Sequence, residues 1–595
     1  MSLLSQFLED QTSDVLLDQL EPSGAILAVD IGSVHTRALL FDIVEGAYRF
    51  VAYGEAPTTT GAPWNNAIEG VYHALQQISQ ATGRTLITEE GALIVPSKGA
   101  LYGVDSFVAT ASAGRPIRAV LVGLVPGMSI QSGKRAAESI YLSLVDVISL
   151  ADQRSPEEQI RALLSAHPDL IMIVGGTDGG AVDSMRRHLA TVILACSLMD
   201  SVSRPTLLYA GNRELAEEVQ ERAEEVGTRV LIADNVRPAL DVEHLDGAQM
   251  QLASLYHRQK AFHNPGFREI GNWSDEGIFP TAYGFGRLVH LLGVFRGQNV
   301  LGIDVGSAAT AVAASLNGKR YLNVFSQLGV GHSAPEVLKH IRPEQIARWL
   351  SFVPRRYDDL VDYVWNRSLF PHTIPASKEA LEIEYAVARE IMRVAVLNAR
   401  QSWHGVQARG LLPYFGTILL SGATLTRPPH YGWSALLALD ALLPVGIARL
   451  LLDPYGIAAA LGAIAPSRPA AVVQMLEKGA FVDLGTVIAF SGRARRGEVI
   501  LRGSLRRQDE TSEEPFEVTA GSLAVFPLEH GARAELTLHP SREIEGLERR
   551  RKVTITGGEL GLIVDARGRP WRFPRADDLR QEMVARWQVA LIGEA

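Results

Sequence analysis

An apolar run followed by the same polar loop occurs twice along the chain. Residues 25–42 read AILAVDIGSVHTRALLFD and residues 300–316 read VLGIDVGSAATAVAASL, so both contain D-[IV]-G-S-x-x-T directly after an apolar run. Each copy continues through a turn, Glu45-Gly46 or Asn317-Gly318, into a further run. Asn-Gly between two apolar runs is a strong hairpin signal. We therefore expect three strands joined by two tight turns in each copy.

The segment between the two copies has a different pattern, in which strand-like and helix-like runs alternate. We expect strands at 118–125, 170–174, 206–209 and 229–233, and helices at 134–150, 156–166, 182–199 and 214–226. Alternation of this kind predicts a parallel, doubly wound sheet. We interpret residues 115–265 as a Rossmann-like domain inserted into the first half of a larger fold.

The chain after the second copy is first helical and later rich in short alternating runs. Residues 379–399 give the clearest helix, and a strand is expected at 417–420. The most hydrophobic stretch, residues 442–465, contains Arg449 and Asp453 and is interpreted as a buried helix pair, not a membrane span. Residues 470–595 predict a small β-barrel or sandwich with a final helix at 576–589.

Composition and charge exclude some classes of protein but do not identify one. The 595 residues include 57 Lys and Arg against 66 Asp and Glu, a formal net charge of −9, whereas a nucleic-acid partner predicts a basic face. Cys196, the single cysteine, cannot form an internal disulfide and is expected to be a buried small hydrophobe. Residues 1–20 are acidic and lack the pattern of a signal peptide. We expect a soluble, cytoplasmic protein that binds neither nucleic acid nor membrane.

The repeated loops carry the chemistry that a polyphosphate requires. Glycine lets a tight turn approach a phosphate closely, Ser and Thr hydroxyls add donors, and an aspartate at a strand end can hold Mg²⁺ through water. A single loop of this kind is more often an ordinary hairpin turn, but two copies with the same spacing favour phosphate binding. The predicted phosphate-binding residues are Asp30, Gly32, Ser33, Thr36, Asp304, Gly306, Ser307 and Thr310, with Asp30 and Asp304 as the Mg²⁺ residues.

The two loops, followed by Ser421-Gly422-Ala423-Thr424 after an apolar strand, resemble the ASKHA superfamily of actin, heat-shock chaperones and sugar kinases. The resemblance implies a duplicated ribonuclease H-like (actin-like) α/β fold that binds ATP. It assigns the first two loops to the phosphates and the third to adenosine. The third loop usually carries two adjacent glycines, and Ala423 stands here in the second place.

A narrower resemblance covers residues 24–465. The motif VGGTDGG at 174–180, the stretch NRSLFPHTIPASKEALEIEYAVA at 366–388 and the two phosphate loops look like the MutL family of glutamate mutase accessory proteins. This family is unrelated to the mismatch-repair protein of similar name. The resemblance implies an ATP-dependent reactivating chaperone whose partner is an adenosylcobalamin-dependent mutase.

The glycine-rich loop of the insert has two readings from its residues alone. Gly175, Gly176, Thr177, Asp178, Gly179 and Gly180 follow a strand and precede a helix, where parallel sheets bind ligands. The same glycines also suit a turn that packs a helix closely on a strand. Two further near-motifs, Asp241-x-x-His244-x-x-Gly247 and residues 127–134, depart from the cobalamin and P-loop spacings and are interpreted as a loop and a helix start.

The predicted organisation has five parts: an N-terminal helical segment at 1–23, the first actin-like half at 24–114, the insert at 115–265, the second half with the adenosine loop at 266–469, and a β-rich domain at 470–595. The favoured function is the reactivating chaperone, acting as a slow Mg-dependent ATPase. A small-molecule kinase and a non-catalytic nucleotide-binding assembly factor are the alternatives. The sequence singles out no general base and no oligomeric state.

Overall fold

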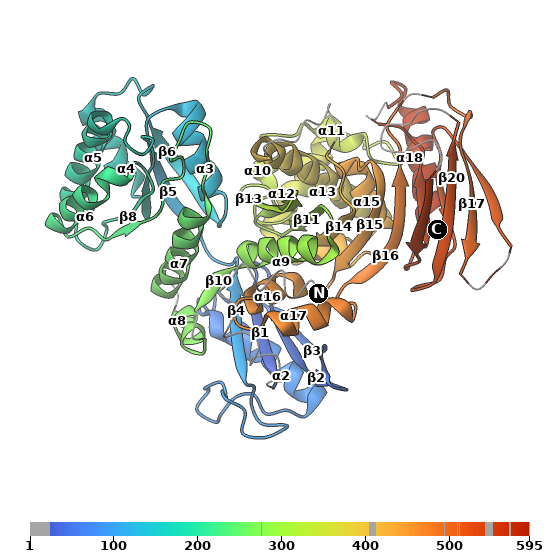
Figure 1. Cartoon of the computed structure of the whole chain (residues 1–595), viewed down its shortest axis with the longest axis horizontal. Helices are drawn as coiled ribbons and strands as arrows, with labels where there is room; N and C mark the ends of the chain where they lie inside the picture. The colour runs from blue at the N-terminus through green and yellow to red at the C-terminus, as the bar shows by residue number, and fades with distance from the viewer. Residues whose placement is uncertain are drawn as a thin grey trace.

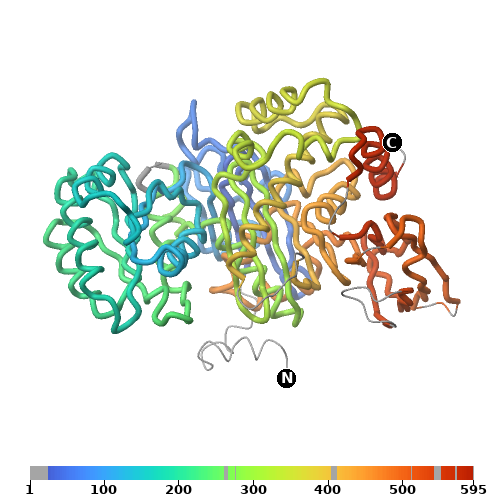
Figure 2. The backbone as a smooth tube through the Cα atoms, turned by 90° about the horizontal axis from the view of Figure 1, so that it is seen from above, coloured from blue at the N-terminus to red at the C-terminus, as the bar shows by residue number. Residues whose placement is uncertain are grey.

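The computed structural model describes residues 24–263, 265–274, 277–403, 412–492, 494–508, 510, 512–541, 551–569 and 573–593. The predicted helical segment at 1–23 lies outside these residues. Figures 1 and 2 show a central body with one lobe on either side, the insert at one end and the C-terminal β-strands at the other.

The first repeat forms the core of a five-stranded sheet with the order β10-β4-β1-β2-β3. Strands β1, β2 and β3 are antiparallel neighbours. Strand β4 lies parallel to β1, and β10 lies parallel to β4. The predicted hairpin strands are thereby confirmed. Their bounds are β1 Ile26–Ile31, β2 His35–Val44, β3 Ala47–Pro57, β4 Ser106–Ala111 and β10 Ile278–Pro280.

The second repeat reproduces this arrangement. In the order β13-β12-β11-β14-β15, three antiparallel strands are again followed by two parallel ones. Asp30 and Asp304 hold the same position, next to last in the first strand of each repeat, β1 and β11. The bounds are β11 Val300–Val305, β12 Thr310–Leu316, β13 Lys319–Phe325, β14 Thr417–Ser421 and β15 Gly446–Asp453.

The predicted helix pair at 442–465 is wrong in its first member, because Gly446–Asp453 is strand β15. This strand lies between β14 and β16 (Val482–Ala489) inside the sheet, so apolar residues are needed on both of its faces. A short continuous apolar run cannot be distinguished from a buried helix by periodicity. Among the residues that the structure describes, no helix is both long and apolar enough to cross a membrane.

Helices cover both faces of the first sheet, which explains why every residue of β1 is buried. Alternate side chains of β1 belong to two different cores: Leu27 and Val29 pack with residues of α2 (Ala67–Thr82), and Ile26 and Ala28 pack with residues of α16 (Ile457–Ile464). Helix α2 begins at the Asn66 cap, whose side chain accepts the Ile68 N–H, and ends at Gly83 with a φ of 71°.

The two halves meet through a crossed pair of helices. Helix α9 (Thr281–Arg296) follows β10 and packs on β11, β12 and β13 of the other sheet, whereas α16 follows β15 and packs on β1 and β4. At the crossing point, a Cβ on Gly462 would lie 1.8 Å from the carbonyl oxygen of Gly284. Glycine is therefore required where the two helix backbones touch.

The insert contains a separate parallel sheet with the order β6-β5-β7-β8-β9, as predicted for a doubly wound unit. The predicted helix at 134–150 is wrong after its first turn, because α3 ends at Ala137 and residues 142–148 form the edge strand β6. The strand bounds are β5 Ile117–Val122, β6 Leu142–Ile148, β7 Leu170–Ile173, β8 Thr206–Tyr209 and β9 Val230–Ile232. The helices are α3 Gln131–Ala137, α4 Pro156–Ala166, α5 Val182–Ser197 and α6 Ala216–Glu225.

The insert contacts both halves of the body. Its helices α7 (Asp246–His263) and α8 (Pro265–Asn272) lead back to β10 in the first sheet. At its other side, the Asn323 amide on β13 donates to the Glu138 carboxylate over 2.6 Å, and the Val324 N–H donates to the Glu138 carbonyl oxygen. A change in the angle between the halves therefore acts on the insert from two sides.

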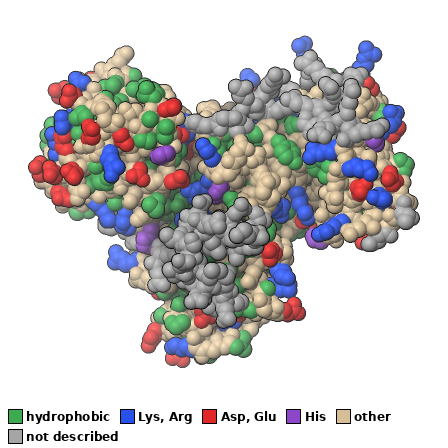
Figure 3. All heavy atoms as spheres, in the orientation of Figure 1, with side chains coloured by type: hydrophobic (Ala, Val, Ile, Leu, Met, Phe, Trp, Pro, Cys, Tyr) green, Lys and Arg blue, Asp and Glu red, His purple; other side chains and the backbone are tan. Residues whose placement is uncertain are grey.

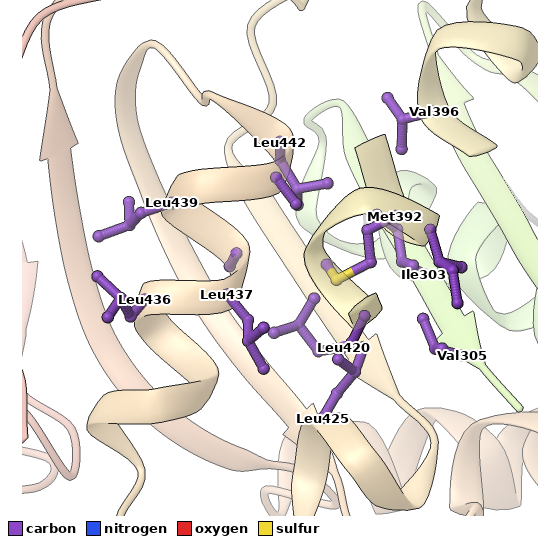
Figure 4. Close-up of a cluster of buried hydrophobic side chains, with 14 of the residues drawn as sticks. Ile303, Val305, Met392, Val396, Leu420, Leu425, Leu436, Leu437, Leu439 and Leu442 are labelled. Atoms are coloured by element: carbon purple, nitrogen blue, oxygen red, sulfur yellow. The ribbon is translucent and has the colours of Figure 1, made fainter. Parts of the chain in front are cut away.

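A large apolar core lies behind the second repeated loop. Figure 4 shows Ile303 and Val305 of β11 and Leu420 of β14 facing Met392 of α13 (Lys378–Ala399) and Leu437 of α15 (Gly432–Leu442). Helix α13 matches the predicted helix at 379–399 and starts at the Ser377 cap. This packing holds β11 and β14 in place, and the two strands end at the predicted phosphate and adenosine loops.

The C-terminal strands form two layers. Strands β16, β22 and β19 extend the second sheet to eight strands, and β17, β18, β20 and β21 form a four-stranded sheet that packs on them through Phe490, Leu501 and Val564. The predicted final helix is confirmed, but the predicted separate barrel or sandwich is not, because β16, β22 and β19 belong to the sheet of the second half. The extents of the domains stay predictions. The bounds are β17 Val499–Arg507, β18 Glu514–Thr519, β19 Leu523–Phe526, β20 Arg533–Pro540, β21 Arg551–Thr556, β22 Leu562–Asp565 and α18 Asp577–Ile592.

Candidate functional site

The two repeated hairpin loops line a single cavity of about 1000 Å³ between the halves. The residues on its wall that the sequence predicted are Asp30, Gly32, Ser33, Asp304, Gly306, Ser307, Gly422, Ala423 and Thr424. Three segments that are up to about 390 residues apart in the chain thus meet at one place. A cavity of this volume is in the range of small-molecule and cofactor sites.

The two loops are built alike. The Gly32 N–H donates to the His35 carbonyl oxygen over 3.0 Å, and the Gly306 N–H donates to the Ala309 carbonyl oxygen over 2.9 Å. A Cβ on Gly32 would lie 2.7 Å from the His35 oxygen, so a larger residue would open the turn. The same closing bond in both copies shows that the repeated sequence folds into a repeated loop.

Thr36 and Thr310 have a different position from the other predicted phosphate residues. Both side chains are fully buried. Thr310 donates to the Leu328 carbonyl oxygen over 2.7 Å, and the Thr36 hydroxyl lies 3.0 Å from that of Thr58, which in turn donates to the Gly32 carbonyl oxygen. These two hydroxyls hold the loops in shape from behind and do not face the cavity.

The two repeated aspartates interact electrostatically across the cavity. The Asp30 carboxylate accepts hydrogen bonds from Thr110 and Thr281, over 2.7 and 2.6 Å. Burial, followed by the negative charges of Asp30 and Asp453, raises the pKa of Asp304 to about 7, against the positive charge of Arg37 and a hydrogen bond from Ser421. A buried carboxylate, Asp30, beside a half-buried one, Asp304, forms a site that a cation would stabilise.

The oxygen donors at this site suit Mg²⁺, which is usually bound through one or two carboxylates and retains several waters. In the part of the chain that the structure describes, no group of three or more His, Cys, Asp or Glu side chains is arranged to hold a metal ion directly. The pair Asp30 and Asp304 therefore fits coordination through water better than direct ligation by the protein alone.

The sequence did not reveal an ion cluster that joins the two halves across the mouth of the cavity. Glu55 of β3 accepts a bond of 2.9 Å from Arg37 and two bonds of 2.8 Å from Arg427, which follows the third loop. Burial opposes ionisation of Glu55, but the hydrogen bond from Arg427 and the charge of Arg37 bring its pKa well below the usual range. The register of the first hairpin pairs Asp30 with Arg37, so this register is the sequence signal that places Arg37 near the cavity.

The third loop passes directly beside the second hairpin. Gly422 has a φ of 94°, and a Cβ on it would lie 2.2 Å from the Val305 carbonyl oxygen. Ser421 is buried and pairs in register with Asp304, while Thr424 donates to Glu384 over 3.3 Å. Gly422 is thus the glycine that the geometry requires, and Ala423 opens the short helix α14 (Ala423–Thr426) without strain.

The glycine-rich loop of the insert lies at the carboxyl end of β7, outside the cavity between the halves. Gly175, Gly176 and Gly179 have positive φ angles, which explains the glycines. The Asp178 carboxylate accepts bonds from the Asn235 amide over 2.8 Å and from the Arg213 N–H over 3.1 Å. These bonds tie three strand ends together, so Asp178 has a structural task whether or not the loop also binds a ligand.

Cys196 has the environment that the sequence predicted. It is fully buried in α5, and burial raises the pKa of its thiol to about 11. At neutral pH the thiol therefore remains protonated, which is typical of a packing residue and not of a nucleophile.

The doubled strand order and the two matched loops around one cavity define a mixed α/β protein built from two halves of the same topology. Comparison of sequences narrows this class. The family model described as MutL protein matches residues 26–480, and the chain belongs to this family. A curated relative, Protein MutL of Clostridium tetanomorphum, is 23% identical over 217 residues, which are 36% of this chain and 45% of that protein. The match therefore spans less than half of the relative's length.

Solved structures with a remote likeness include a nucleotide-free acetone carboxylase, with a TM-score of 0.33 and 11% identity over 83% of this chain and 81% of that one. A glycerol dehydratase reactivase gives a TM-score of 0.31 and 10% identity over 75% and 100% of the two chains. Component A of the (R)-2-hydroxyglutaryl-CoA dehydratase of Acidaminococcus fermentans gives a TM-score of 0.26 and 9% identity, over 76% of this chain and 100% of that one.

Proposed function

We propose that this chain binds ATP with Mg²⁺ in the cavity between its halves and uses it to reactivate an adenosylcobalamin-dependent mutase. The observation that carries the nucleotide part is the meeting of both Asp-x-Gly-Ser loops at one cavity. The mutase part is supported by membership of the MutL family and by the resemblance of the sequence to its mutase accessory proteins. The proposal includes a cytoplasmic location.

Each loop would contribute in the same way to polyphosphate binding. The backbone N–H groups of Ser33 and Ser307 would donate to phosphate oxygens from opposite sides, because the glycines before them allow the backbone to approach closely, while the Gly32 and Gly306 N–H groups close the turns. The hydroxyl of Ser33 adds a donor, whereas Ser307 is partly engaged with His332, 2.9 Å from its Nδ1. Asp30 and Asp304 would hold Mg²⁺ through water, and the cation would neutralise charge on the phosphates.

Nucleotide binding would be transmitted to the insert by its two attachments. Phosphate contacts to both loops draw the halves together about the crossing of α9 and α16. Because the insert is tied to the first half by α7 and α8 and to the second by Glu138 and Asn323, closure changes its orientation. The insert is therefore the part proposed to act on the mutase. Slow hydrolysis then resets the cycle, and no side chain is assigned as its general base.

The experiment is a phosphate-release assay on the full chain with Mg²⁺ and ATP. The proposal predicts slow release without any added substrate and faster release with a mutase inactivated by damaged cofactor. ATP consumption that is stoichiometric with phosphorylation of a sugar or acid would contradict the proposal and favour a kinase. Nucleotide binding without hydrolysis and without stimulation would favour an assembly factor.

A further inference from the structure

The C-terminal helix α18 lies beside the cavity, although it follows the family-matched residues 26–480 by almost a hundred residues. Its residues on the cavity wall are Ala585, Gln588, Val589, Ile592 and Gly593, which recur at the spacing of one helix face. Figure 1 shows α18 next to α15, and the two helices are in contact. The tail of the chain thus adds to a cavity that is otherwise lined by residues of the family-matched region.

The opposite face of α18 is fixed firmly to the body. Trp587 and Leu591 are buried, and the guanidinium of Arg567 lies 4.6 Å from the centre of the Trp587 ring. The Leu591 carbonyl oxygen lies so close to Gly432 that a Cβ there would be 2.1 Å from it. Since α15 starts at Gly432, shortly after the third loop, the packing sets the position of α18 relative to that loop.

The wall around this face of α18 is suited to a flat, aromatic group. Tyr385 and Trp433, whose ring centres are 5.1 Å apart, line the cavity beside the third loop. Val589 contributes an aliphatic side chain that is 46% exposed, and Gln588 contributes an amide. Aromatic and aliphatic side chains beside the Gln588 amide suit a purine base, which offers an apolar face and a polar edge. The hairpin loops, by contrast, offer backbone N–H groups and hydroxyls.

We infer that α18 forms part of the base subsite, so that the C-terminal tail determines the affinity for the purine portion of the nucleotide. This inference rests on the proposed binding of ATP and extends it to a segment outside the family-matched region. It predicts that changes on the cavity face of α18 weaken binding of the base while binding of the phosphates persists.

The test measures, by calorimetry, the affinity of the full chain for two probes in the presence of Mg²⁺. The probes are ATP and inorganic tripolyphosphate. Val589→Glu places a charge against the base, and its desolvation should weaken ATP binding about tenfold or more. Tripolyphosphate binding should stay within about twofold at physiological salt, because screening limits the effect of a distant charge. Leu579→Glu, a matched change on the same helix at a side chain that is 52% exposed and off the cavity wall, should change neither affinity.

Thermal melting checks that each variant is folded. If Val589→Glu does not fold, Ala585→Glu repeats the test one helical turn away on the same face. Unchanged ATP affinity in a folded cavity-face variant would overturn the inference while leaving the proposed function intact. Equal losses for ATP and tripolyphosphate would also overturn it, since α18 would then act on the whole site. A wild-type chain that binds neither probe would contradict the proposed function itself.

Discussion

Asp30 and Asp304 occupy matching positions but have different surroundings. Asp30 accepts two hydroxyl hydrogen bonds, from Thr110 and Thr281, whereas Asp304 lies near two other carboxylates and has a pKa raised to about 7. An aspartate with that pKa is half protonated at neutral pH and becomes fully ionised when a cation arrives. Under the proposed binding of Mg²⁺, the second loop would therefore respond to both pH and metal.

Replacement of this aspartate should stabilise the protein without ligand. Because the folded pKa of Asp304 exceeds the value of 3.8 for an unperturbed Asp, the folded state binds the proton more tightly than the unfolded state. Its stabilising contribution is complete below pH 3.8 and is lost as the pH rises to about 7. We expect Asp304→Asn to raise the free energy of unfolding by about 1–3 kcal/mol at pH 8 and by much less at pH 4.

Thermal melts of both proteins at the two pH values measure this effect. A variant that is less stable than the wild type at pH 8 would show that the Asp304 carboxylate is compensated in the folded state, contrary to its raised pKa.

The affinity for Mg²⁺ and ATP should also depend on pH. Mg²⁺ requires the ionised carboxylate, so binding should release a proton from Asp304 below pH 7 and become tighter between pH 6 and pH 8. Calorimetry in buffers of different ionisation enthalpy counts the released protons. Asp304→Asn should remove the proton release, and a proton count that is the same in both proteins would assign the pH dependence to another group.

At the scale of elements, local sequence patterns are sufficient to predict the hairpins. They are insufficient to predict which residues from distant parts of the chain meet at the cavity. The repeated loops could be predicted because their turns and strands are neighbours in sequence. The bonds from Arg427 to Glu55 join residues 372 positions apart, and no local pattern encodes them. Strand β15 was mistaken for a helix because a fully buried strand and a buried helix share the same apolar composition.

The contribution of α18 to the cavity could not be predicted for the same reason. Its helical pattern was visible in the sequence, but its position depends on packing against α15, about 150 residues earlier. The roles of Thr36 and Thr310 were likewise assigned from their motif, whereas the strand pairing turns both hydroxyls into the interior.

The crossing of α9 and α16 should be intolerant of any side chain. Gly462→Val places a branched side chain where the Gly284 carbonyl oxygen lies, so the helices must separate. We expect a loss of several kcal/mol in unfolding free energy or, if the chain remains folded, at least a tenfold loss of ATP affinity, as the halves lose their alignment. Denaturant unfolding and calorimetry measure the two effects.

Gly127→Ala is the control for this variant, since a Cβ on Gly127 meets no neighbouring atom. If Gly462→Val had wild-type stability and affinity, the two helices would not be the contact that aligns the halves.

At the scale of the whole molecule, the insert and the C-terminal strands lie on opposite sides of the body (Figures 1 and 2). On the visible face of the insert, acidic and basic side chains are interspersed (Figure 3), which suits a protein partner bound through both signs of charge. The cavity lies between the two halves of the body and is also lined by residues of α18.

The contact of Asn323 with Glu138 should couple the insert to the cavity. Asn323→Ala removes the amide donor, so the insert loses one of its attachments to the second half. We expect unchanged affinity for ATP but a loss of most of the stimulation by inactivated mutase in the phosphate-release assay. Glu138→Gln retains an acceptor for the Asn323 amide and serves as the control. Full stimulation in Asn323→Ala would show that closure reaches the partner by another route.

A double-mutant cycle of ATP affinity on Asp30→Asn and Asp304→Asn, measured by calorimetry with Mg²⁺ at pH 8, tests the central claim most directly. If both hairpins hold one metal-bound polyphosphate, the wild-type chain binds one ATP and each replacement weakens ATP binding about tenfold or more. The loss of binding free energy in the double variant is then smaller than the sum of the two single losses, by about 1 kcal/mol or more. Additive losses, or wild-type affinity in either single variant, would contradict the shared site.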